Sequence, residues 1–249
     1  MRAYWALTRR ELAGFFLSIT GYVIIAATAF LLGLSFVILL VNLQQEPTSM
    51  PVTEIFYMTQ FFWLILLLAV PVITMRLFAL EKYSGTFETL MTTPVSEVQV
   101  VTAKFTAALV FYMIIWLPLL GCLLIVRHYS NQTSTLDPGA VGSTFLGILL
   151  LGSLFIALGC FASSLTRSQG TAAMISLAFT SSLFLLSFLA RRRGNSDWKS
   201  QTLAYLGLPD QMHDFVRGVV DTRPVVLYLS LTFLFLFLTL RVVESRRWK

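Results

Sequence analysis

The chain has 249 residues, of which 57% are hydrophobic and only 12% are charged. A soluble domain carries about 25% charged residues, and a chain of this length has too little interior to hide so much apolar surface from water. The composition therefore excludes a soluble globular protein and a disordered chain, and it indicates a protein embedded in lipid. The net charge of +6 then indicates orientation in a membrane, so we expect no nucleic-acid partner.

Six stretches without a charged side chain meet or approach the roughly 20 residues that a helix needs to cross a bilayer. Because lipid offers the backbone no hydrogen bonds, these stretches must be helical. We therefore predict an all-α integral membrane protein with an amino-terminal segment at residues 1–20 and a membrane domain at residues 21–249. The six spans are predicted at about residues 21–41, 56–75, 105–126, 141–166, 171–190 and 224–243.

The distribution of basic residues predicts which side of the membrane holds the termini. With six spans, both termini lie on one side, and that side carries eleven of the Lys and Arg residues, against seven on the other. The positive-inside rule makes the richer side cytoplasmic. Residues 191–223 break the pattern, because this outer loop holds six of the seven. We predict a multi-pass protein of the bacterial cytoplasmic (inner) membrane with both termini in the cytoplasm.

Two segments outside the spans have an amphipathic pattern. Residues 3–16 mix aromatic and apolar side chains with three charged groups, which is typical of a helix lying in the headgroup layer, and we predict an elbow helix leading into span one. In the last outer loop, four apolar residues share one helical face, and Asp210 is a candidate N-cap. We predict an outer amphipathic helix there, with His213, Asp214 and Arg217 facing water or headgroups. The apolar face is Met212, Phe215, Val216 and Val219.

The connection between spans two and three is the most informative loop. Gly85 permits a sharp turn, Thr86 can cap a new helix, and Pro94 ends that helix soon afterwards. Ser96 and Gln99 have the spacing of a capping box that starts the next helix. A helix this short is marginal alone, and it is expected to dock in the groove of a partner. An interfacial connector is the simpler alternative. The predicted docking residues are Thr86, Phe87, Glu88, Leu90, Met91 and Pro94, and the predicted cytoplasmic anchor is Arg76, Glu81 and Lys82.

Motifs for nucleotide or metal chemistry are missing from the sequence. No Gly-Lys pair exists, so the chain has no P-loop for ATP, and neither a His-Glu-x-x-His nor a Gly-x-Ser-x-Gly motif occurs. The predicted spans contain no ionisable residue of the kind that ion-coupled carriers hold at membrane depth. We predict that the chain is no enzyme and binds no cofactor or metal, and that energy reaches it from outside. Small residues at Ala172, Ser176 and Thr180 offer a candidate helix-dimer face.

Several of these segments together resemble the signature of ABC-2-type transporter permeases, and most closely the gliding-motility-associated permease subunits. The likeness extends along the whole chain, and Leu80 departs from it, since an acidic residue is expected before Glu81. The segments that carry it are Pro71-Val-Ile-Thr74-Met75-Arg76, Glu81-Lys82-x-x-Gly85-Thr86-x-Glu88-x-Leu90, Thr93-Pro94-Val95-Ser96, Phe215-x-x-Gly218-Val-Val-Asp221 and Glu244-Ser-Arg246-Arg247-Trp248.

The resemblance implies a division of labour. Two permease subunits, as a homodimer or a heterodimer, form the pathway of an exporter, and a separate cytoplasmic ATPase dimer binds ATP and Mg. The short helix from Phe87 to Thr92 becomes the coupling helix on which ATP-driven closure pushes. Membrane lipid is a further expected partner, and a periplasmic accessory protein stays open. The alternative is a membrane scaffold of an envelope or motility complex, regulated by an ATPase without a transported substrate.

Overall fold

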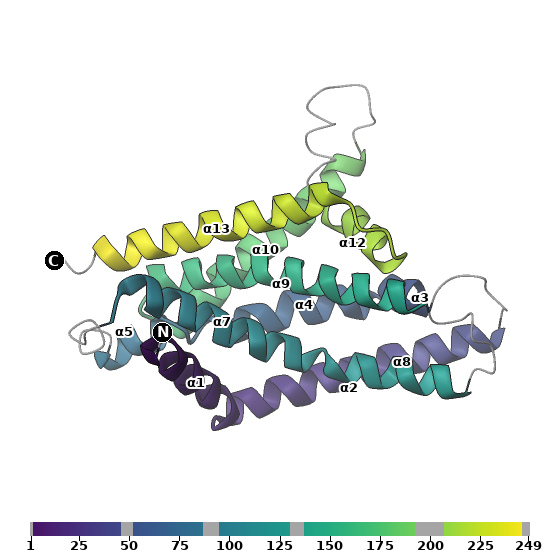
Figure 1. The fold of residues 1–249 in the computed structure, drawn as a ribbon, viewed down its shortest axis with the longest axis horizontal. Helices are drawn as coiled ribbons and strands as arrows, with labels where there is room; N and C mark the ends of the chain where they lie inside the picture. The colour runs from purple at the N-terminus through teal and green to yellow at the C-terminus, as the bar shows by residue number, and fades with distance from the viewer. Residues whose placement is uncertain (1, 46–51, 87–94, 130–136, 193–206, 246–249) are drawn as a thin grey trace.

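The computed structural model describes residues 2–45, 52–86, 95–129, 137–192 and 207–245, and these residues form helices and turns without a strand (Figure 1). Most of the helices run roughly parallel along one long axis. The helices are α1 (Arg2–Phe16), α2 (Ile19–Gln45), α3 (Val52–Met58), α4 (Gln60–Thr74), α5 (Ala79–Ser84), α7 (Glu97–Ile115), α8 (Leu117–Tyr129), α9 (Pro138–Leu165), α10 (Gln169–Arg192), α12 (Leu208–Val216) and α13 (Thr222–Ser245).

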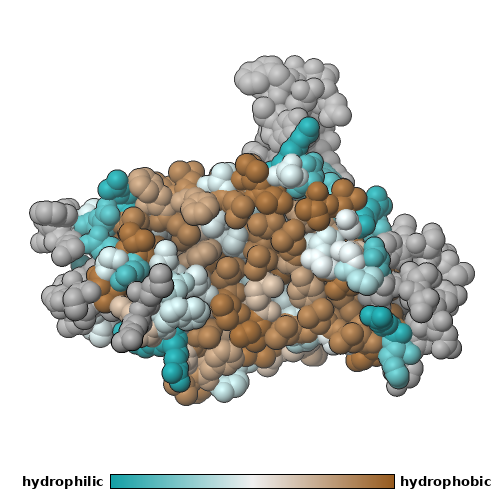
Figure 2. Space-filling view, viewed as in Figure 1, coloured by the Kyte–Doolittle hydropathy of each residue, from teal (hydrophilic) through white to brown (hydrophobic). Residues whose placement is uncertain are grey.

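The predicted all-α membrane fold is confirmed. Six helical stretches in the described residues are long and apolar enough to cross a membrane, and each overlaps one predicted span. Figure 2 shows hydrophobic residues across the middle of one face and hydrophilic residues toward its two ends, as expected for a protein that crosses a bilayer. The stretches are 19–41, 60–84, 97–128, 138–165, 169–186 and 222–245.

Helix α9 is the centre of the bundle, and it packs against α13, α10, α12, α4 and α7. Its glycines receive side chains from three neighbours. A Cβ at Gly152 would lie 2.1 Å from Tyr112 of α7, and one at Gly159 would lie 2.2 Å from the Thr74 hydroxyl of α4. Gly147 in the same way receives the side chains of α12. Small residues on α9 therefore let α4, α7 and α12 approach it closely, which is how helices associate in lipid.

Two predicted spans are interrupted in the structure. The predicted span 56–75 divides at Thr59 into the short, buried helix α3 and the longer α4. The predicted span 105–126 divides at Trp116, because Pro118 has no N–H to continue the ladder and the backbone instead bonds from Leu119 N to Trp116 O at 3.1 Å. After this break α8 packs against α2, whereas α7 packs against α9 (Figure 1).

The two ends of the bundle carry different helices. One end holds α1, α5 and the last turns of α13, and we call it the termini-bearing end (Figure 1). The other end holds α3, α12 and the last turn of α8, and we call it the opposite end. The amino-terminal segment that was expected as an elbow is helix α1, which packs mainly on α7 and turns at Ser18 into α2.

Three details of the sequence interpretation were wrong. Helix α12 is capped at Gly207, and Asp210 lies inside its first turn, because Pro209 occupies an early helical position. Met212, Phe215 and Val216 are buried as predicted, but the helix ends before Gly218 and Val219 is 56% exposed. The proposed dimer face on α10 is buried inside the chain, where the Thr74 hydroxyl of α4 lies 3.5 Å from that of Ser176.

Candidate functional site

Helix α5 joins the second span to the loop predicted to dock a partner. It ends at Gly85, whose φ of 74° lies in the left-handed region that glycine adopts without strain. Thr86 follows on the exposed surface, with its hydroxyl 2.8 Å from that of Ser84. The predicted docking residues Phe87, Glu88, Leu90, Met91 and Pro94 lie outside the described residues. The chain resumes with the capping box of Ser96 and Gln99, which is confirmed at the start of α7.

Helix α5 is fastened to the end of α9 by two serines. The Ser163 hydroxyl accepts hydrogen bonds from the backbone N–H groups of Phe78 and Ala79, both at 3.1 Å, and so caps α5 from another helix. It also donates to the carbonyl of Met75 at 3.3 Å. The Lys82 ammonium donates to the backbone carbonyl of Ser164, at the last turn of α9. The predicted anchor residue Lys82 therefore holds α5 to the central helix.

A cluster of four charged residues, which we call the ion cluster, fastens α5 to α1 and α7. Its centre is Lys104 of α7, whose side chain is 2% exposed. The Lys104 ammonium lies 2.8 Å from Glu81 Oε1 of α5 and 3.1 Å from Glu11 Oε1 of α1. Arg10 completes the cluster, at 2.8 Å from Glu11 and 3.2 Å from Glu81. Three helices from distant parts of the chain thus meet on one buried cation.

The neighbouring cations of the ion cluster favour the ionised form of Glu11. Burial alone would raise the pKa of Glu11, but the attraction of Lys104 and the hydrogen bond from Arg10 outweigh it, so the pKa lies below its ordinary value. The Lys104 ammonium also lies 5.5 Å from the centre of the Phe78 ring, a favourable cation–π distance. The cluster therefore holds three helices together through Oε1 of each glutamate, while Glu81 Oε2 is buried without a hydrogen-bond partner among the described residues.

The third predicted anchor residue, Arg76, acts at the turn between α1 and α2. Its guanidinium donates to the Ser18 hydroxyl at 3.0 Å and also to the Thr20 hydroxyl. Helix α1 is held on its other side by stacking of Phe15 on Phe111 of α7, with ring centres 4.7 Å apart. The anchor residues Arg76, Glu81 and Lys82 therefore contact three different parts of the termini-bearing end and make α5 part of a rigid assembly.

A second ion pair, with a buried carboxylate and a half-exposed arginine, lies at the opposite end. Glu54 of α3 is 2% exposed, and its Oε1 accepts from Arg217 at 2.7 Å and lies 3.1 Å from the His213 ring. The hydrogen bond from Arg217 lowers the pKa of Glu54 against the opposing effect of burial. His213 and Arg217 were expected to face water or headgroups. Their side chains are 30% and 50% exposed, as expected, but both also contact Glu54 and so hold α12 to α3, which was not foreseen. The Thr53 hydroxyl adds a bond of 2.9 Å to the carbonyl of Val216.

The residues that the sequence interpretation missed are Glu11, Lys104, Ser163 and Glu54. Lys104, Ser163 and Glu54 are buried and Glu11 is partly buried, but each meets a partner from a segment far away in the chain, so no local spacing identifies it. The signal that was available is position: Lys104 and Glu54 stand directly beside long apolar runs. In the described part of the chain no group of His, Cys, Asp and Glu is placed to hold a metal ion. The described contacts thus join α5 to α1, α7 and α9.

The sequence matches the family model of the ABC-2 family transporter protein over residues 40–192, which is more than half of the chain. The match includes the second span, α5, the ion-cluster residues Glu81 and Lys104, and α9. No curated protein matches the sequence. This family consists of the membrane subunits of ABC transporters, which pair with a cytoplasmic ABC ATPase. With its six apolar helices, the chain belongs to the ABC-2 transporter family and is a multi-pass membrane permease subunit of an ABC transporter.

Proposed function

We propose that the chain is the permease of an ABC-2 exporter that works as a dimer and is driven by a separate cytoplasmic ATPase dimer through residues 86–94. The ATPase supplies ATP and Mg chemistry, and the permease supplies the pathway. The termini-bearing end faces the cytoplasm of the bacterial inner membrane, as the basic residues predict. Residues 1–20 form the elbow, and residues 21–249 form the permease domain.

The observation that carries the proposal is the attachment of α5. A loop can transmit force only where its base is rigid, and α5 is held by Ser163 and Lys82 to α9 and by Glu81 to Lys104 of α7. Residues 86–94 leave α5 directly after Gly85. A push on this loop would therefore be received by α5 and passed to the central helix. Thr86, Phe87, Glu88, Leu90, Met91 and Pro94 are the proposed contacts to the ATPase, with Arg76, Glu81 and Lys82 as their base.

The test replaces Leu90 by Asp, which places a charge on the apolar face of the proposed coupling helix. We expect the ATPase to be lost on co-purification, and permease-stimulated ATP hydrolysis to fall to the level of the ATPase alone. Val219→Asp is the matched control, because Val219 is exposed at the opposite end of the bundle. Unchanged association in Leu90→Asp would contradict docking at this loop.

A transport assay on the same complex, reconstituted in vesicles, distinguishes an exporter from the alternative, a membrane scaffold. ATP-dependent movement of a candidate cargo supports export. Stable association and ATP hydrolysis in the vesicles, without movement of any cargo, would favour a scaffold of an envelope or motility complex. A carrier that moves cargo in vesicles without any ATPase would contradict both.

A further inference from the structure

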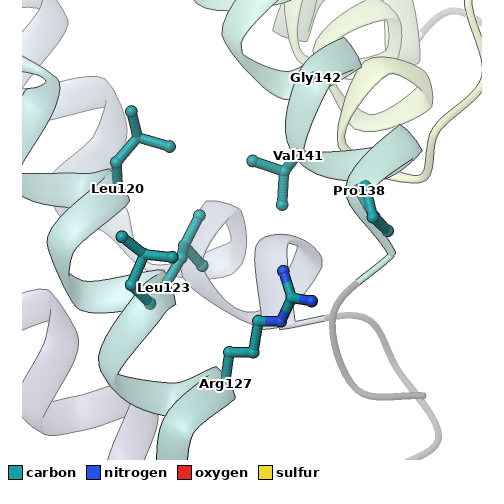
Figure 3. A pocket seen from close by; sticks show the side chains of 7 residues that line it. Leu120, Leu123, Arg127, Pro138, Val141 and Gly142 are labelled. Atoms are coloured by element: carbon teal, nitrogen blue, oxygen red, sulfur yellow. The ribbon is translucent and has the colours of Figure 1, made fainter. Parts of the chain in front are cut away.

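The break in the third span opens a groove on the lipid-facing side of the bundle. Before the break α7 packs on α9, and after it α8 turns toward α2, so the space between α8 and α9 is left open. A cavity of about 280 Å³ lies there, between Leu120, Leu123 and Arg127 of α8 and Val141 of α9 (Figure 3). A second cavity of about 290 Å³ continues from Leu120 along α7. We call the two cavities together the α8–α9 groove.

The groove is apolar along its length and charged at one end. The cavity along α7 is lined by Leu, Val, Ile, Met and Phe side chains alone. The cavity beside α8 has one charged lining residue, Arg127, which lies in the last turn of the helix. Figure 3 shows the Arg127 side chain at the edge of this cavity, with its guanidinium extended into the gap between α8 and Pro138. An apolar channel with a single cation at its mouth is complementary to an amphiphile with an anionic head.

The charge of Arg127 is not used inside the described part of the chain. Arg127 is exposed and makes no ion pair with any described residue. The sequence between it and Asp137 has no acidic residue. The Asp137 carboxylate itself accepts a hydrogen bond from the backbone of Gly139 at 3.0 Å, as the N-cap of α9. Among the described residues Arg127 therefore has no anionic partner, and a guanidinium suits phosphate oxygens well.

The length of the groove fits one leaflet of a bilayer. From Leu117, where α8 begins, to Arg127 the helix advances about 15 Å at about 1.5 Å per residue. The hydrocarbon core of a bilayer is about 30 Å thick, so one leaflet contributes about half of it. A lipid with its phosphate at Arg127 would place the end of its acyl chain near Leu117. The break at Trp116 therefore sets both the direction and the depth of the groove.

We propose that the α8–α9 groove is a binding site for one anionic phospholipid of the leaflet at the opposite end, with its phosphate on Arg127 and an acyl chain between α8 and α9. The lipid fills the space that the broken span leaves and ties α8 to α9. The site does not depend on the coupling loop at the other end of the bundle, so its failure would leave the proposed function untouched.

The test measures lipid binding by native mass spectrometry on the purified chain, with its ATPase if the two co-purify. The probes are phosphatidylglycerol and phosphatidylcholine with identical acyl chains. We expect the wild type to prefer phosphatidylglycerol, and Arg127→Gln to weaken that lipid about fivefold while the affinity for phosphatidylcholine stays unchanged. Arg223→Gln is the matched control, because Arg223 is an exposed arginine outside the groove at the start of α13. It should bind as the wild type does.

A second variant tests the acyl-chain part of the site. Leu120 lines both cavities, so Leu120→Trp should fill the groove and weaken both lipids at this site. If that variant fails to fold, Leu149→Trp fills the cavity along α7 from the side of α9. Equal binding of phosphatidylglycerol to Arg127→Gln and the wild type would overturn the proposal. Two other results would also overturn it. Inorganic phosphate alone could protect Arg127 from phenylglyoxal, which would indicate a phosphate site. Leu120→Trp could lose a dimer of this chain and no lipid, which would indicate a dimer interface.

Discussion

Replacing Lys104 by Met tests whether the ion cluster holds α5 in place. Methionine keeps the length and apolar character of the lysine side chain but removes the charge that faces Glu81 at 2.8 Å and Glu11 at 3.1 Å. Removing one partner of a buried ion pair costs about 3–5 kcal/mol, because the opposite charges stay behind without compensation. The side chains of Glu11 and Glu81 are about 15% exposed, and both carboxylates still have Arg10 as an ion-pair partner. We therefore expect a loss near the lower limit, about 3 kcal/mol.

The assay is urea unfolding of the purified chain in detergent at pH 7, compared with Arg241→Met as the matched control. Arg241 lies 2.8 Å from Glu244, but these side chains are 63% and 31% exposed, and an exposed pair contributes less than about 1 kcal/mol. The double variant Lys104→Met with Glu81→Gln should recover part of the loss, since one stranded carboxylate is neutralised. A Lys104→Met chain no less stable than Arg241→Met would refute the role given to the cluster.

The same variant changes how stability depends on pH. The pKa of Glu11 in the folded chain lies below its ordinary value of 4.5. Its ionised form therefore stabilises the fold at every pH above about 4.5, and this contribution is lost as the pH falls through the lower, folded value. The wild type should lose stability in that acidic range. Without Lys104 the largest attraction on Glu11 is gone, so the unfolding free energy should vary less there.

Two further substitutions test the contacts of α9. Gly152→Ala should destabilise the chain by about 1–3 kcal/mol, because the new methyl group would lie 2.1 Å from the Tyr112 ring. Gly142→Ala on the same helix is the control: its methyl group meets nothing within 4 Å, so it should be neutral or slightly stabilising in the same unfolding assay. Ser163→Ala leaves two buried amides at the start of α5 without that acceptor, at a cost of about 1–3 kcal/mol, and should speed hydrogen exchange in α5. Ser181→Ala should change neither, because the Ser181 hydroxyl is partly exposed and bonds to the carbonyl of Ala178 in its own helix.

The spans could be predicted from sequence because lipid imposes a constraint that is local. A stretch of roughly 20 apolar residues has to satisfy its own backbone, so length and composition suffice, and all six predictions overlap a helix. The turn at Gly85 and the capping box of Ser96 and Gln99 were equally predictable, since each depends on residues at most three apart. Local geometry thus accounts for the part of the fold that the sequence determines directly.

The ion pairs could not be predicted because their partners are chosen by tertiary packing. Arg10 and Glu81 are 71 positions apart, and Arg217 and Glu54 are 163 apart. The amphipathic pattern of α12 correctly identified the buried Phe215 and its neighbours. The same pattern placed Arg217 toward water, and its side chain is 50% exposed, but the pattern did not reveal Glu54 as its partner, because periodicity gives the polarity of a face and carries no information about an acidic group on another helix.

Helix α9 connects the two ends of the bundle. At the termini-bearing end Ser163 holds α5. At the opposite end the Ser143 hydroxyl donates to the backbone carbonyl of Phe215 in α12, and Gly147 leaves room for the Phe215 side chain. Because α9 is a single continuous helix from residue 138 to residue 165, a displacement of α5 has a direct path of contacts to α12. Helix α12 is in turn tied to α3 by Glu54. Under the proposed coupling at residues 86–94, a displacement of α9 would therefore also act on the contacts between α12 and α3, among them the ion pair of Glu54 with Arg217.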